Sequence, residues 1–167
     1  MIKSRFFARY HSMKNKIFLL ALSLVCSLTQ AKEILPKGCK SLVIEGSLIS
    51  IPKGEPRLIA LHNLTQTDLW VTHPVTEGDI STSLSSQLQK DKWSLLKMNH
   101  TAFTLSCIES KPGHEQQISC KHVISACEWP TIKKQQKQDI LWVAENMTLS
   151  PLIAYATRKG WMTSLDK

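Results

Sequence analysis

The sequence predicts a mainly β fold, an antiparallel β-sandwich of about seven strands with one short C-terminal helix. Two observations predict it. Short runs of alternating apolar and polar residues recur along the chain, and clusters of Gly, Pro, Asn, Asp and Ser separate them. Only one segment, near the C-terminus, carries the start and stop signals of a helix.

Seven segments fit β-strands, because turn residues bound each of them. They are residues 41–51, 57–64, 69–73, 93–98, 102–110, 116–129 and 140–145. Gly46 interrupts the first segment, as a β-bulge would, and the sixth is either one long strand or a bent pair. Residues 52–56 and 111–114 are expected to form turns, and the polar segments 76–92 and 131–139 are expected to be exposed connections.

The C-terminal helix is predicted from the residues at its ends. Ser150 can cap the first turn, and Pro151 suits the first helical position because no helical hydrogen bond needs its backbone N–H there. Gly160 suits the position after the last turn. Arg158 and Lys159 place positive charge at the negative end of the helix dipole.

The first 31 residues have the composition of a secretory signal peptide. Basic residues precede an apolar run at 17–25, and a short polar stretch ends at Ala31. The run is about half the ~20 residues that a membrane-spanning helix needs. We therefore expect residues 1–31 to be a cleaved leader, with translation starting at Met1 or at Met13. Residues 32–167 are then exported as one β-rich domain. A retained membrane helix is the alternative.

Removal of the leader changes the charge of the chain. The full sequence has 21 Lys and Arg and 13 Asp and Glu residues, a formal net charge of +8. Five of the basic residues and none of the acidic ones lie in the leader, so the exported part carries +3. A nucleic-acid-binding domain needs a basic stripe, and the exported part has one short cluster, Lys133, Lys134 and Lys137. We expect no nucleic-acid partner.

Four cysteines remain in the exported part, namely Cys39, Cys107, Cys120 and Cys127. An even number in an exported chain is typical of disulfide bonds, and four cysteines allow three pairings. If the hairpin turn is centred between Gly113 and His114, Cys107 lies directly opposite Cys120, at a separation that a disulfide can bridge. Elimination then pairs Cys39 with Cys127.

The histidines give an alternative hypothesis, a copper-binding protein that resembles a cupredoxin. Small copper-carrying sandwiches have a His-Asn pair on an early strand, and a Cys, a Pro-Gly-His sequence and a Met on a later hairpin. This chain has His-Asn at 62–63 and Pro-Gly-His at 112–114, so His62 and His114 would bind copper with a third ligand such as His73. The pattern departs from a cupredoxin, because the Cys-to-His segment is too long and no Met follows it.

No catalytic signature is present. The sequence has no Gly-x-Ser-x-Gly, no His-Glu-x-x-His and no phosphate-binding loop. We therefore expect no enzymatic activity and no cofactor, and the leading hypothesis is an exported interaction or accessory protein. Trp93 and Trp161 are the candidates for partner binding, provided that their side chains are exposed.

Residues 105–120, 69–74 and 142–146 resemble segments of the enhanced entry protein EnhB family. The resemblance covers most of residues 39–160. It implies an exported, virulence-associated protein of intracellular Gram-negative bacteria, linked to entry into host cells and located in the periplasm, secreted or attached to the envelope. The implied partner is a protein or another component of the cell envelope, and the resemblance supplies no catalytic residues.

Overall fold

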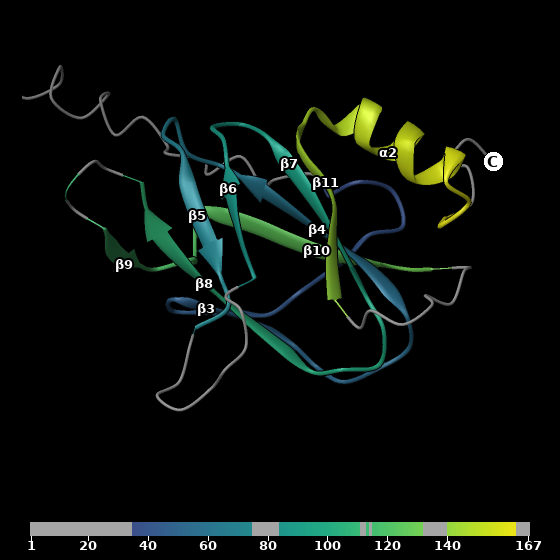
Figure 1. The fold of residues 1–167 in the computed structure, drawn as a ribbon, viewed down its shortest axis with the longest axis horizontal. Helices are drawn as coiled ribbons and strands as arrows, with labels where there is room; N and C mark the ends of the chain where they lie inside the picture. The colour runs from purple at the N-terminus through teal and green to yellow at the C-terminus, as the bar shows by residue number, and fades with distance from the viewer. Residues whose placement is uncertain (1–34, 75–83, 111–112, 114, 132–139, 163–167) are drawn as a thin grey trace, which may run out of the picture. The chain divides into compact units, whose positions relative to one another are not determined.

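Two antiparallel sheets and one helix make up the part of the chain that the computed structural model describes (Figure 1). The described residues are 35–74, 84–110, 113, 115–131 and 140–162. The expected leader, 1–31, lies outside them, so its cleavage stays a prediction. Within the described residues, no helix has the length and apolar character needed to cross a bilayer.

Sheet A has five strands in the order β1–β10–β4–β7–β11. Their bounds are β1 Lys40–Ser41, β10 Ile124–Pro130, β4 Arg57–Asn63, β7 Trp93–Met98 and β11 Ile140–Met147. β4 is the central strand, and it pairs with β10 on one side and with β7 on the other. Neighbouring strands and layers on both faces bury β4 and β7 almost completely, which explains the continuous apolar run 58–61 in β4 and the mainly apolar sequence of β7.

Sheet B has the strand order β2–β3–β8–β5–β6, and β9 pairs with β8 beyond the end of β3. The bounds are β2 Ile44–Glu45, β3 Leu48–Ile51, β8 Phe103–Glu109, β5 Leu69–Thr72, β6 Ser85–Leu88 and β9 Gln116–Ile118. Along β3 and β5 every second residue is buried, so one face of sheet B points into the core and the other points outward.

Two apolar clusters hold these layers together. The first lies between the sheets and includes Ile49, Val71 and Leu105 from sheet B with Ile59 and Leu96 from sheet A. The second lies on the outer face of sheet A, where the helix α2 (Leu149–Arg158) buries Leu152 and Ala156 against β4, β7 and β10 side chains. Figure 1 shows α2 beside β7 and β11. The helix therefore covers sheet A.

The two sheets are joined at both corners of the sandwich. At one corner the chain passes from β1 in sheet A to β2 in sheet B, and the Leu42 N–H donates to the carbonyl of Ala126. At the other corner β6 lies against β11, where Ser86 bonds Glu145 and the Gln89 N–H donates to Asn146 Oδ1 at 2.8 Å. These contacts protect the edges that an open sheet would expose.

The predicted fold class is confirmed, although the described residues hold eleven strands where about seven were expected. The first predicted strand, 41–51, is divided among β1, β2 and β3, and Gly46 takes φ +56° in a two-residue hairpin turn rather than in a bulge. The sixth, 116–129, is the bent pair β9 and β10, whose members belong to different sheets.

Residues 85–88 were expected in an exposed connection, and this was wrong. They form β6, which pairs with β5 and buries Ser86 and Leu88. Residues 76–83 of that connection lie outside the described residues, as do 111–112, 114 and 132–139 of the expected turn and polar loop.

The helix begins at Leu149, two residues earlier than predicted. Thr148, not Ser150, is the N-cap residue, and its extended backbone precedes the first turn without a side-chain hydrogen bond. Pro151 therefore occupies the third helical position, which also needs no intrahelical N–H donor. The end is as expected, because Gly160 follows the last turn with φ +66°.

The described residues form two disulfides, Cys39–Cys127 and Cys107–Cys120, which are the pairs that the sequence predicted. The predicted hairpin register was wrong, because Cys107 lies opposite Ile118 on β9 and not opposite Cys120. The first bond belongs to the apolar cluster beneath α2 and the second to the cluster between the sheets.

Candidate partner-binding site

The outer face of sheet B carries the side chains that alternate with its buried ones. The strand register arranges them in rows. One row is Gln117, Ile108, Trp70 and Gln87, and the next is Glu45, Leu48, Ser106, Thr72 and Ser85. Because directly opposite side chains in a sheet lie ~4.5–5.5 Å apart at Cβ, the members of each row are neighbours, although Ser106 in the second row is buried.

This face combines apolar side chains with hydroxyl and amide groups. Trp70 and Ile108 are half-buried neighbours, Leu48 is 36% exposed and Val43, just before β2, is 62% exposed. Glu45 is the one charged residue in the two rows. Aromatic residues such as Trp70 are enriched at protein interfaces relative to the rest of the surface.

A groove of about 540 Å³ lies at one end of this face. Its apolar lining consists of Val43, Ile51, Pro52, Ala102 and Phe103. Its polar lining consists of Glu45, Ser50, His73 and Thr104. Ser50 and Thr104 are cross-strand partners on β3 and β8, so both lie on the outer face. The volume falls within the ~300–1,000 Å³ typical of ligand pockets.

Two contacts fix the imidazole of His73 at this groove. Its Nδ1 lies 2.8 Å from the carbonyl oxygen of Thr104, and its ring stacks on Phe103 with 4.5 Å between centroids. A carbonyl oxygen can only accept, so Nδ1 is the donor and the neutral ring keeps Nε2 as its acceptor. His73 therefore brings a positioned hydrogen-bond acceptor.

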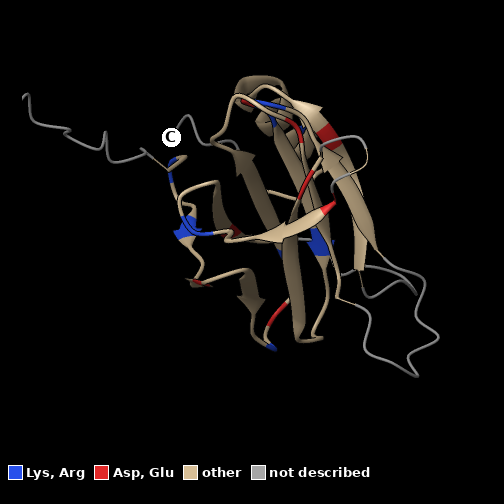
Figure 2. Ribbon diagram, turned by 90° about the vertical axis from the view of Figure 1, so that its left-hand side faces the viewer, with Lys and Arg blue, Asp and Glu red and all other residues tan. Residues whose placement is uncertain are grey.

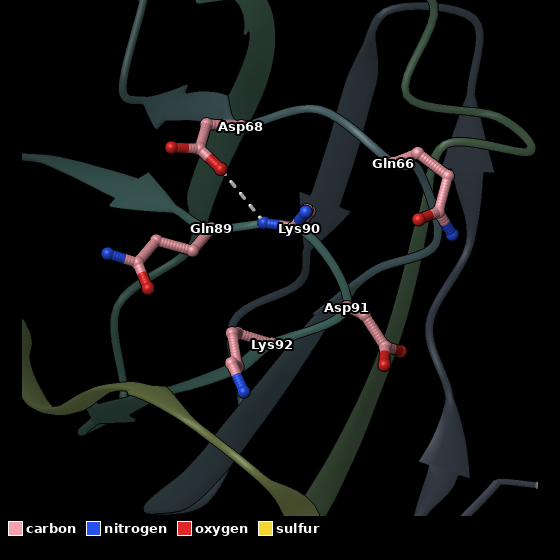
Figure 3. Close-up of a pocket in the computed structure, with 6 residues that line it drawn as sticks. All are labelled: Gln66, Asp68, Gln89, Lys90, Asp91 and Lys92. Carbon is pink, nitrogen blue, oxygen red and sulfur yellow. Dashed lines mark hydrogen bonds between the residues drawn. The ribbon is translucent and has the colours of Figure 1, made fainter.

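A second, polar pocket of about 330 Å³ lies where the β4–β5 and β6–β7 loops meet (Figure 3). It is lined by Gln66, Asp68, Gln89, Lys90, Asp91 and Lys92. The Lys90 backbone N–H donates to the Asp68 carboxylate at 3.0 Å, which ties the two loops together. Figure 3 shows the side chains of Asp68 and Gln89 on one side and those of Gln66 and Asp91 on the other. They do not converge on a common point.

The structure separates the proposed copper ligands that it describes. His62 lies on β4 in sheet A, where it stacks on Trp93 with 4.3 Å between centroids and its Nε2 is 3.2 Å from Asp91 Oδ1. His73 follows β5 in sheet B, and His114 lies outside the described residues. Cys107 is bonded to Cys120 and is no free thiolate. The described residues contain no group of three or more His, Cys, Asp or Glu able to hold a metal ion.

The two tryptophans proposed for partner binding lie elsewhere. Trp93 is only 6% exposed and stacks on His62, so it does not meet the condition of exposure under which it was a candidate. Trp161 is half-buried beside α2, edge-on to Tyr155 and 5.2 Å from the Lys97 ammonium. Trp70 on β5 is half-buried and lies on the outer face of sheet B.

The predicted lysine cluster at positions 133, 134 and 137 lies outside the described residues. Figure 2 shows Lys and Arg at separate places along the ribbon, with Asp and Glu between them. The expectation that the chain has no nucleic-acid partner stays a prediction.

No protein-family model, curated protein or solved structure matches the chain. The resemblance to the enhanced entry protein EnhB family therefore also stays a prediction.

Proposed function

We propose that this chain is an exported, non-catalytic interaction protein that binds a protein or another envelope component through the outer face of sheet B. One observation carries the proposal. The helix covers the outer face of sheet A, whereas the outer face of sheet B carries Trp70, Ile108 and Leu48 at its surface. Tryptophan is among the residues most enriched at the few interface positions that contribute most to binding energy.

Export to the periplasm is supported by the cysteines and by the leader. Both described disulfides are compatible with an oxidising compartment, and the basic-apolar-small order of residues 1–31 is that of a signal peptide. Intact-mass measurement of protein from a periplasmic extract tests this part. We expect a mass that begins at Lys32, and an uncleaved chain held in the membrane fraction would contradict export.

The absence of catalysis is proposed from the lack of a catalytic motif in the sequence and from the diverging side chains of the polar pocket. Copper binding is not proposed, because the described arrangement of His62 and His73 gives it no support.

The binding face is tested by two matched substitutions of exposed leucines. Leu48 lies on sheet B at 36% exposure and Leu141 lies on β11 of sheet A at 39% exposure. Each is changed to Ser, and tagged protein is purified from an envelope extract after crosslinking. We expect Leu48→Ser to lose a partner that the unchanged protein and Leu141→Ser retain. A partner retained equally by both variants would exclude this face.

A further inference from the structure

The groove at the end of sheet B is lined by hydrogen-bond acceptors but by no basic side chain of Lys or Arg. None of its lining residues is Lys or Arg, and its four polar residues all offer acceptors: the Glu45 carboxylate, the Ser50 and Thr104 hydroxyls and the His73 imidazole. Glu45 is exposed, and no described Lys, Arg or His forms an ion pair with it. The groove thus offers negative charge and lone pairs without an internal cation.

The remaining lining is aliphatic or aromatic. Val43 is 62% exposed at the β2 side, whereas Phe103, which stacks on His73, also packs against the cluster between the sheets. A ligand that complements this groove has an apolar stem and a cationic head. Alkylammonium groups meet both requirements, because the stem packs on apolar surface while the head donates three hydrogen bonds.

A lysine fits these acceptors better than an arginine does. A guanidinium is planar and is best matched by two carboxylate oxygens in a fork, whereas an ammonium is a compact charge with three rotatable donors. The Glu45 carboxylate by itself suits either cation, since its two oxygens can accept a fork, but the other acceptors come from separate residues on β3, β8 and the end of β5. Single acceptors from several directions favour the ammonium.

We propose that this groove binds a lysyl side chain of a partner protein. The stem lies against the exposed Val43, and the ammonium lies among Glu45, His73 and the Ser50–Thr104 hydroxyl pair. The volume of about 540 Å³ also leaves room for the residues that flank the lysine in the partner. The inference rests on the proposed function, and it names the chemistry of the partner.

NMR titration of the disulfide-bonded protein, expressed from the full chain, tests the proposal. The probes are the blocked amino acids Nα-acetyl-lysine N-methylamide and its norleucine and arginine counterparts. We expect the lysine probe to shift the backbone amides of Ser50, His73 and Thr104, and the norleucine probe, which lacks the ammonium, to bind more weakly. Equal affinity for norleucine, or tighter binding of arginine, would overturn the proposal.

Charge removal at the groove gives the matched comparison. Glu45→Gln should weaken lysine binding about threefold to tenfold, as the loss of a charge-assisted contact at an exposed site does. Glu115→Gln removes an exposed carboxylate that does not line the groove, and it should leave binding unchanged. Ser50→Lys places a competing cation in the groove and should abolish binding. Unchanged affinity in Glu45→Gln or in Ser50→Lys would contradict the assignment.

These results are separable from the test of the proposed function. If Leu48→Ser loses the envelope partner but the lysine probe causes no response, the result would contradict lysine binding in the groove and support the proposed binding face. A lysine response without any partner dependent on Leu48 would contradict the proposed function instead.

Discussion

Cys107 is bonded to Cys120, although the residue directly opposite Cys107 in the β8–β9 ladder is Ile118. The bond thus reaches past the end of the ladder and holds the segment that follows β9. The Cys120 N–H donates to the carbonyl of Gly46 at 2.8 Å, and Ser119 Oγ donates to the same oxygen at 3.0 Å. The disulfide therefore links β8 to the tip of the β2–β3 hairpin.

Removal of the Cys107–Cys120 bond should destabilise the protein. The bond joins cysteines 13 residues apart, and a loop of this size corresponds to about 3 kcal/mol in the chain-entropy treatment. The change Cys107→Ala with Cys120→Ala should lower the free energy of unfolding by about this amount in a urea titration. Unfolding free energies equal to that of the unchanged protein would contradict the prediction.

Loss of Cys39–Cys127 should cost more than loss of Cys107–Cys120. The separation is 88 residues, which raises the entropic contribution to about 4.5 kcal/mol. The same titration on Cys39→Ala with Cys127→Ala checks the order of the two variants. A smaller loss for this pair than for the short loop would show that loop length does not govern the difference.

Asn63 should be essential for the corner after β4. Its buried side chain donates to the carbonyls of Thr67 and Leu88 at 2.8 and 2.9 Å and accepts from the Thr65 N–H and hydroxyl. Asn63→Ala removes all four bonds and leaves buried groups unpaired, so we expect a loss of about 2–4 kcal/mol.

The control for this corner is Gln66→Ala, an exposed change in the same loop that should alter stability by less than about 0.5 kcal/mol. Urea unfolding of both variants provides the measurement. Similar stabilities for Asn63→Ala and Gln66→Ala would show that these hydrogen bonds contribute nothing net.

Gly46 should resist substitution for a reason of backbone conformation alone. Its φ is +56°, and a Cβ added there would meet no heavy atom within 4 Å. Gly46→Ala should therefore cost about 1–2 kcal/mol through left-handed strain without a steric clash. Ser47→Ala in the same turn should cost far less, and thermal unfolding of the two variants compares them. Equal melting temperatures would argue against a strained turn.

The sequence predicts strands best where burial is strong. Strands β4 and β7 are rich in apolar residues because both of their faces are covered. The sequence located both strands correctly. β6 was missed because its Ser-Ser-Gln-Leu sequence has little strand propensity, and its pairing with β5 overrides that preference.

The candidate site was harder to predict, because it depends on strand order. Alternation in Leu69-Trp70-Val71-Thr72 already indicates that Trp70 points away from the buried Leu69 and Val71. The groove, however, combines residues 43–52, His73 and 102–104, which only the β2–β3–β8–β5 order brings together. No local pattern contains that information.

Site-specific photo-crosslinking in cells tests the central claim, that the outer face of sheet B binds a partner. A photoreactive amino acid replaces Leu48 on sheet B in one strain and Leu141 on sheet A in another, since their exposures are nearly equal. We expect a discrete crosslinked species from position 48 and none from position 141. Crosslinks from position 141 alone, or none from position 48, would contradict the claim.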